Sequence, residues 1–317
     1  MGIIVTKYKE GFLKRYDKDP GIPYYSFSDF PGLSCESGFF LNSEGVNISY
    51  FWYAYPNVEE KMNILFCPGM GPGHTAYLSE IQYLCSEGYK VLTLDYTGCG
   101  SSGGLRMTSV NAPVRDAVEL LRHLGIKDRI TPVGHSLGGY TALSLSRILP
   151  FVTRAVVLSG FVSISDEMMG MLKFRFLADR VRAYERKLLP EYGSGDNARY
   201  LKTTKDRILW IHSKDDPMVN YRYNAGQAER MNNPNVTVVG VEGKGHNPNY
   251  SAQALTHMHA WIGEYMSRCG RGDLSTLEEK KAFFDDKPIS EMTEQDPQIW
   301  KMIIDFLKAD QNANFCE

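Results

Sequence analysis

A serine between two glycines carries the clearest chemical signal in the sequence. The motif is Gly134-His135-Ser136-Leu137-Gly138, a G-x-S-x-G pattern. Residues 129–133 before it predict a strand, and residues 137–149 after it predict a helix. A serine in such a strand-to-helix turn sits on strained backbone and projects its hydroxyl clear of the sheet. We therefore predict that Ser136 is a nucleophile; the alternative is an ordinary glycine-rich turn.

The hydroxyl of a serine is a weak nucleophile, so it needs a general base. His246 lies in the glycine-rich stretch Gly243-Lys244-Gly245-His246, directly after the last predicted strand. His257 and His259 are two residues apart on a predicted helix and therefore do not share a face. The side chain of His135 is expected to point away from the serine. We predict His246 as the base; the alternative is a surface loop histidine.

A carboxylate is needed to hold the imidazole in one tautomer and to stabilise its protonated form. Lys214-Asp215-Asp216-Pro217 follows the strand predicted at residues 207–211. By residue type, either aspartate could serve. The three candidate groups then occur along the chain in the order serine, acid, histidine.

The elements that must position these groups alternate between strand and helix. Strands are predicted at residues 37–41, 47–55, 63–67, 90–94, 129–133, 154–158, 207–211 and 236–241, and helices at 74–87, 111–124, 137–149, 221–231 and 252–266. This alternation predicts an α/β fold, a mostly parallel twisted sheet with helices on both faces. Ligands bind such sheets beyond the carboxyl ends of the strands, where all three candidate groups lie.

Three motifs together resemble the α/β-hydrolase superfamily. They are the nucleophile turn at 134–139, the D-x-x-G-x-G-x-S loop at 95–102, and the acid loop at 211–219. Over about residues 47–266 the chain is similar to single-domain esterases, lysophospholipase-like enzymes and serine-aminopeptidase-like hydrolases. This resemblance implies the α/β-hydrolase fold, and its register selects Asp216 over Asp215.

The resemblance also implies an oxyanion hole made by two backbone amides. One belongs to the residue after the nucleophile, Leu137, and the other to the loop at 67–73. By position Met70 supplies the second amide, with Gly71 as the alternative, because Pro68-Gly69 stands where similar enzymes often have His-Gly.

The whole chain, residues 1–317, is interpreted as one domain with two additions. Residues 161–205, rich in Met and Phe, predict a mostly helical cap insertion, and residues 268–317 predict a C-terminal helical extension. In that extension Asp296 can cap a helix that has Pro297 at its first position. Its apolar stripe either packs against the body or forms a homodimer contact; the stripe comprises Ile299, Trp300, Ile303, Ile304 and Leu307.

Composition and charge argue against several classes of function. A net charge of −2 gives no basic surplus for binding nucleic acid through its phosphates. We expect no membrane span and no signal peptide, because no apolar run is long enough for either. The six cysteines include no C-x-x-C pair. We therefore expect a cytoplasmic protein with no metal and no cofactor.

These residues favour a serine hydrolase that cleaves a small-molecule carboxylic ester through an acyl-enzyme on Ser136. The cap, rich in Met and Phe, favours a hydrophobic or aromatic acyl group. Two alternatives remain open: an acyltransferase with the same triad, and a ligand-binding protein of this fold without catalysis.

Overall fold

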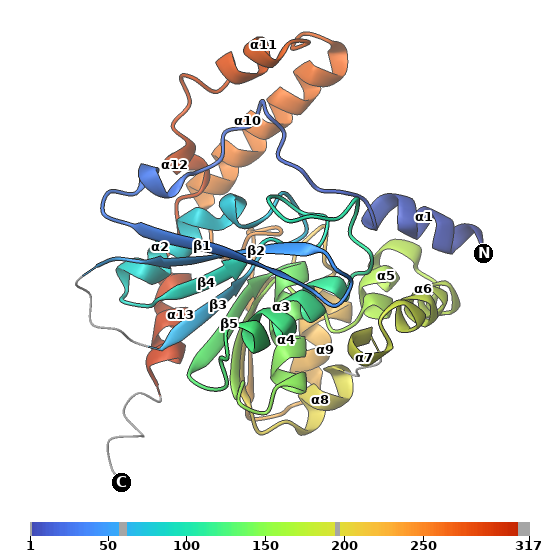
Figure 1. Cartoon of the computed structure of the whole chain (residues 1–317). Coiled ribbons are helices and arrows are strands. Elements are labelled where there is room, and N and C mark those ends of the chain that lie inside the picture. Colours follow the sequence, from blue (N-terminus) through green and yellow to red (C-terminus); the bar gives the residue numbers. More distant parts are fainter. Residues whose placement is uncertain (1, 57–61, 194–196, 310–317) are drawn as a thin grey trace.

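The computed structural model describes residues 2–56, 62–193 and 197–309. Within them, an eight-stranded sheet has the order β1-β2-β4-β3-β5-β6-β7-β8 (Figure 1). In chain order the strands are β1 (Ser34–Leu41), β2 (Asn47–Ala54), β3 (Asn63–Cys67), β4 (Val91–Leu94), β5 (Ile130–His135), β6 (Arg154–Leu158), β7 (Arg207–Ser213) and β8 (Val236–Val241). β1 and β2 pair antiparallel, β2 pairs antiparallel with β4, and the remaining pairs are parallel. The predicted α/β fold with a mostly parallel sheet is confirmed.

Helices cover both faces of the sheet. They are α1 (Ile3–Phe12), α2 (Leu78–Ser86), α3 (Ala112–His123), α4 (Leu137–Ile148), α5 (Ile164–Leu172), α6 (Arg175–Leu188), α7 (Pro190–Gly193), α8 (Asn197–Thr203), α9 (Ala225–Arg230), α10 (Ala252–Arg271), α11 (Leu277–Ala282), α12 (Ile289–Met292) and α13 (Pro297–Lys308). α2 and α13 share one apolar cluster on one face, while α3, α4 and α9 pack on the other. β4, β5 and β6 are buried along their whole length, as parallel strands covered on both sides must be.

Three predicted helices differ in detail from the structure, and the one expected at 252–266 continues to Arg271 as α10. The one expected at 74–87 begins with a single 3₁₀ turn, His74–Tyr77, before α2. The one expected at 221–231 is interrupted at Asn224, whose backbone has φ −119° and ψ −97°. The side chain of Asn224 accepts a hydrogen bond from the amide of Val162 and so fixes this break against the segment after β6.

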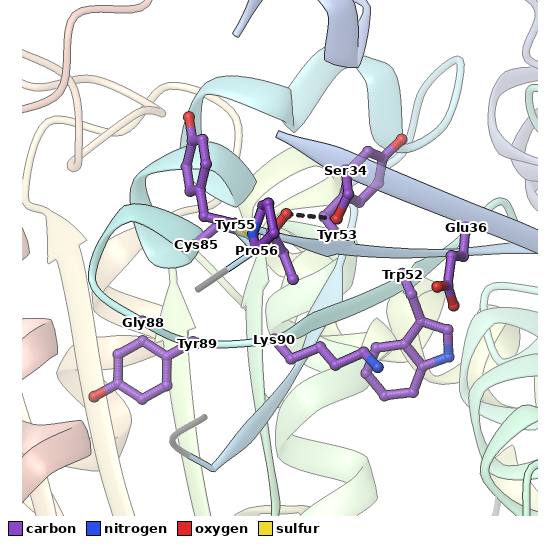
Figure 2. Close-up of a pocket in the computed structure, with 11 residues that line it drawn as sticks. Ser34, Glu36, Trp52, Tyr53, Tyr55, Pro56, Cys85, Gly88, Tyr89 and Lys90 are labelled. Carbon is purple, nitrogen blue, oxygen red and sulfur yellow. Dashed lines mark hydrogen bonds between the residues drawn. The ribbon is translucent and has the colours of Figure 1, made fainter. Parts of the chain in front are cut away.

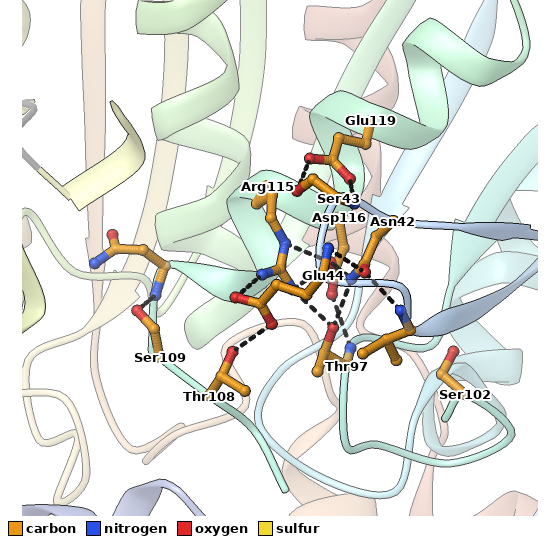
Figure 3. A network of polar contacts seen from close by, with 12 residues as sticks. Asn42, Ser43, Glu44, Thr97, Ser102, Thr108, Ser109, Arg115, Asp116 and Glu119 are labelled. Carbon is orange, nitrogen blue, oxygen red and sulfur yellow. Dashed lines mark hydrogen bonds and ion pairs between the residues drawn. The ribbon is translucent and has the colours of Figure 1, made fainter. Parts of the chain in front are cut away.

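A buried polar network fixes the β1–β2 hairpin turn to α3 and to the loop after β4 (Figure 3). The guanidinium of Arg115 is 1% exposed and pairs with Glu44 and Asp116. Asp116 in turn accepts hydrogen bonds from the Asn42 side chain at 2.9 Å and from the amide of Thr97 at 2.8 Å. A buried guanidinium requires such partners. The network therefore holds the loop at 95–102 in place.

The N-terminal helix α1 was not predicted. It packs on α6, and its buried residues are Val5 and Tyr8. Tyr8 donates a hydrogen bond to the Glu185 carboxylate of α6 at 2.7 Å. The spacing of Val5, Tyr8 and Phe12 is the helical signal that could have revealed this element.

The segment at 161–205 contains α5 to α8, so its predicted helical character is confirmed; residues 194–196 lie outside the described residues. α5 and α6 lie beside α1, and α7 packs on α6 (Figure 1). α8 packs on α4 instead, where Asn197 bonds to Ser144 and Arg147. The role of the segment as a cap stays a prediction.

The apolar stripe of α13 is buried against this chain's own sheet. Its five residues lie in one cluster with α2 and with apolar residues of β3 to β7. The stripe therefore packs against the body, while a homodimer through other parts of the extension stays a prediction. α10 and α11 project away from the sheet (Figure 1). Residues 310–317 of the predicted extension lie outside the described residues.

No helix in the described part of the chain is both long and apolar enough to cross a bilayer.

Candidate active site

The G-x-S-x-G turn has the strained geometry that the sequence predicts. Ser136 has φ 57° and ψ −120°, a conformation that side chains rarely adopt. The two glycines are required by close approach of backbone to backbone. A Cβ added at Gly134 would lie 2.1 Å from the carbonyl oxygen of Gly138, and one added at Gly138 would lie 1.8 Å from that of Cys67. The turn therefore presents Ser136 between β5 and the start of α4.

Asp216, on the loop after β7, is held by four donors. Its Oδ1 accepts from the amides of Met218 and Val219, at 2.8 and 2.9 Å. Its Oδ2 accepts from the His246 ring at 2.9 Å and from the His212 ring at 3.1 Å. Burial alone would raise the pKa of Asp216, but the bonds from His212 and His246 hold it well below its usual range. Asp215 instead accepts from the Gly243 amide at 3.0 Å.

The hydrogen bond to Asp216 defines the tautomer of His246. An ionised carboxylate only accepts hydrogen bonds, so Nδ1 of His246 carries the proton and donates it. Nε2 is then left with a lone pair that can take a proton. This is the arrangement that a general base requires.

The structure brings the predicted site residues together at one cavity of about 610 Å³. Ser136, Leu137, Met70 and His246 line it, and Asp216 lies behind His246 with 7% exposure. Gly69 packs against the nucleophile turn, since a Cβ added there would lie 3.3 Å from Cβ of Ser136. The loop expected to carry the second oxyanion amide therefore abuts the serine.

Most of the cavity wall is apolar and comes from segments far apart in the sequence. The apolar and aromatic residues are Phe12, Tyr16, Val110, Phe161, Ile164, Met171, Pro217, Met218 and Val219. Phe174 and Phe176 of the Met- and Phe-rich segment do not line it and are 60% and 63% exposed. The N-terminal contribution was missed: Phe12 ends α1, and Tyr16 lies in the segment after it.

The expectation that His135 points away from the site is wrong. Its ring lines the cavity, with its centroid 4.6 Å from that of His246. Nε2 of His135 donates to the carbonyl oxygen of His246 at 2.7 Å, so Nδ1 accepts from the hydroxyl of Tyr77 at 3.0 Å. Burial and the neighbouring His246 lower the pKa of His135 to about 3, which keeps this ring neutral. His135 thus supports the backbone of the predicted base.

Glu167 of α5 is a second polar group that the sequence did not single out. It lines the cavity, is 8% exposed, and receives one long hydrogen bond from Asn224 at 3.4 Å. Burial and the nearby charge of Asp216 raise the pKa of Glu167 to about 8. An ionised carboxyl group buried in an apolar wall destabilises the fold unless a hydrogen-bond donor or a positive charge pairs with it.

Another hollow in the structure does not contain the predicted site residues. A smaller hollow of about 200 Å³ lies at the β2 and β4 end of the sheet, where Lys90 covers the ring of Trp52 (Figure 2). None of the predicted site residues lines it. Among the described residues, no group of three or more His, Cys, Asp or Glu side chains could hold a metal ion.

Comparison with known proteins agrees with the fold described above. The model of the alpha/beta hydrolase family matches residues 64–204. The chain belongs to the α/β-hydrolase superfamily. An esterase from Pyrococcus furiosus has a similar structure, with a TM-score of 0.56 and 17% identity over 83% of this chain and 99% of that one.

Curated relatives of this α/β-hydrolase carry two kinds of name. The chain is 26% identical over 212 residues to a proline iminopeptidase of Saccharolobus solfataricus. The matched residues cover 62% of this chain and 67% of that relative. It is 27% identical over 138 residues to a putative esterase/lipase of Haemophilus influenzae, which covers 42% of this chain and 47% of that relative. The superfamily places the chain among hydrolases without deciding between esters and peptides.

Proposed function

We propose that this α/β-hydrolase cleaves carboxylic esters through a covalent acyl-enzyme on Ser136. The observation that carries the proposal is the hydrogen bond of 2.9 Å between Asp216 and His246, at a cavity that Ser136 also lines. A carboxylate-oriented imidazole beside a strained serine is the arrangement that acyl transfer requires.

The proposed reaction has two halves. The Ser136 hydroxyl attacks the ester carbonyl while Nε2 of His246 takes its proton, and the amides of Leu137 and Met70 bind the oxyanion. His246 then gives that proton to the leaving alcohol. In the second half, a water molecule loses a proton to His246 and attacks the acyl carbonyl. The bond to Oγ of Ser136 then breaks, Oγ takes the proton back from His246, and the acid is released. Each oxyanion amide is expected to contribute ~3 kcal/mol to transition-state stabilisation.

We assign a hydrophobic or aromatic acyl group to the apolar part of the cavity. The support is the lining of Phe12, Phe161, Ile164 and Met171. Such side chains bind apolar groups by excluding water.

The test is a panel of 4-nitrophenyl esters of increasing acyl length, assayed with the wild type and Ser136→Ala. We expect hydrolysis by the wild type and a loss of at least about 10³-fold in the variant. Full activity of Ser136→Ala would refute the mechanism. Transfer to an added alcohol in preference to water would instead support an acyltransferase. Ligand binding without turnover would support a binding protein.

Glu167 favours a second candidate, the hydrolysis of acyl groups that carry a free amine. Among the cavity-lining residues Glu167 is the carboxyl group, and a protonated amine would pair with it. The similarity to a proline iminopeptidase points the same way. The test compares alanine 4-nitroanilide with its propanoyl analogue. Glu167→Gln should raise KM about tenfold for the amine substrate alone if this candidate is correct; equal effects on both substrates would exclude it.

A further inference from the structure

The C-terminal segment at 293–296, just before α13, runs beside the loop that carries His246. This histidine loop comprises residues 243–251. The amide of Asp296 donates to the carbonyl of Asn249 at 2.8 Å, and the amide of Ser251 donates to that of Glu294 at 2.8 Å. Tyr250 and Gln295 pair as an antiparallel bridge. The two segments are therefore joined as neighbouring strands are.

An ion pair joins the same two segments from the other end of the loop. Nζ of Lys244 lies 2.7 Å from Oδ2 of Asp296 and donates to the carbonyl of Tyr250, also at 2.7 Å. The two side chains are 14% and 19% exposed, so water screens the pair only partly. Partial burial opposes it, but the bond from Lys244 lowers the pKa of Asp296. Lys244 is two residues before His246, so the pair ties the start of the histidine loop to the C-terminal segment, and the bond to Tyr250 ties it to the end of the loop.

The segment that makes these contacts is itself anchored in the core. Oδ1 of Asp296 caps α13 by accepting from the amides of Gln298 and Ile299, at 2.9 and 3.3 Å. The indole of Trp300 is fully buried and donates to Gln295 at 2.6 Å. The buried helix α13 is thus a fixed support on which the histidine loop rests.

We propose that residues 294–296 of the C-terminal extension are positioning residues, which hold the His246 imidazole in register with Ser136 through Lys244 and Asn249. Proton transfer tolerates little displacement, and a shift of ~1 Å can cost about a hundredfold in rate. This support lies outside residues 64–204, the part that matches the family model. The proposal rests on the proposed function, because it assigns a purpose to the position of His246.

Asp296→Ser tests the proposal, because serine also caps helices but cannot reach Lys244. We expect kcat for a 4-nitrophenyl ester to fall about tenfold with KM within about twofold of the wild type. Lys244→Met should do the same. The double variant should lose no more than Lys244→Met alone, because Lys244→Met already removes the whole ion pair together with the bond to the Tyr250 carbonyl.

Two controls separate positioning from a general loss of stability. Lys301 and Asp305 form an exposed ion pair on the same helix, so Lys301→Met and Asp305→Asn should retain wild-type kcat. Asp296→Ala, which also loses the cap, should lower the melting temperature, whereas Asp296→Ser should keep it within about 2 °C of the wild type.

A measurement independent of activity completes the test. In Asp296→Ser, hydrogen exchange should accelerate at residues 243–251 and stay unchanged in α4 and β5. Wild-type kcat and wild-type exchange in Asp296→Ser would overturn the proposal, and so would a loss of kcat that is additive with Lys244→Met. A wild type inert toward esters would refute the proposed function instead. The exchange result would still show whether residues 294–296 hold the histidine loop in place.

Discussion

Ser136 occupies a backbone conformation that costs stability. Its φ of 57° with ψ of −120° is accompanied by close backbone contacts at Gly134 and Gly138, where a Cβ atom would not fit. Residues held this way carry of order 1–3 kcal/mol of strain. At the residue scale, the site therefore combines a strained serine with an aspartate and two histidines whose hydrogen bonds fix their tautomers.

Replacing Ser136 with glycine should separate the effect of backbone strain on stability from the effect of losing the hydroxyl. Ser136→Gly and Ser136→Ala both remove the hydroxyl, but only glycine relieves the positive φ. We expect the glycine variant to be more stable than the alanine variant by about 1 kcal/mol, measured by urea unfolding. Equal stabilities would mean that the turn is not strained.

Glu167 should make the stability of the fold depend on pH. The folded-state pKa of about 8 lies above the ordinary value of 4.5 for this carboxyl. Its stabilising contribution is fully present below pH 4.5 and is lost as pH rises through about 8, because ionisation in the cavity is unfavourable.

Glu167→Gln stays neutral at every pH, so it should escape that loss. The melting temperature of Glu167→Gln minus that of the wild type should be a few degrees larger at about pH 9 than at about pH 5. Calorimetry at both values measures the difference. A difference that does not change with pH would contradict the raised pKa.

At the scale of elements, α1 matters because it forms part of the cavity wall. Tyr8 bonds to Glu185, the backbone of Tyr16 pairs with Gly98 and Gly100, and Phe12 lies between them at the cavity. Contacts of α1 and of the segment after it thus hold Phe12 and Tyr16 in the cavity wall.

Shortening Phe12 should change which esters fit. Phe12→Ala should shift the ratio of kcat/KM for octanoate over butanoate esters roughly tenfold toward the longer chain. Phe39→Ala, which removes a ring that is 68% exposed on β1, is the matched control and should leave the ratio unchanged. The same ratio in Phe12→Ala and the wild type would place the acyl group elsewhere.

Sequence patterns predicted the elements that are defined by local signals. The strands from β3 to β7 are short apolar runs that are buried by helices on both sides, and the loops after β5, β7 and β8 carry Ser136, Asp216 and His246. The orientation of His135 and the burial of Glu167 could not be predicted in the same way. Both depend on contacts with residues distant in sequence, Tyr77 and Asn224. The burial of α1 depends on packing against α6, which is distant in sequence, although the spacing of Val5, Tyr8 and Phe12 is helical.

On the scale of the whole molecule, the C-terminal extension is divided between a projecting arm and the core. Within the extension, Phe283 at the end of α11 packs on Tyr265 of the preceding helix α10 to form the arm, whereas α13 is buried under the sheet. The extension thus supports both the fold and, by our proposal, the histidine loop.

Removing the indole of Trp300 should destabilise the entire domain. Trp300 is fully buried in the cluster that includes α2 and the sheet. Trp300→Ala should cost about 3–5 kcal/mol of unfolding free energy, and denaturation should remain a single transition. A separate early transition of the C-terminal residues would show that α13 is not part of the same cooperative unit.

The central claim is that Ser136 is activated by His246, and covalent labelling tests it most directly. The wild type, His246→Gln and Ser136→Ala would be incubated with a fluorophosphonate, and the modified peptide would be mapped by mass spectrometry. We expect one adduct on Ser136 in the wild type, labelling slowed at least about a hundredfold in His246→Gln, and none in Ser136→Ala. Equal labelling rates in the wild type and His246→Gln, or an adduct on another residue, would contradict the account.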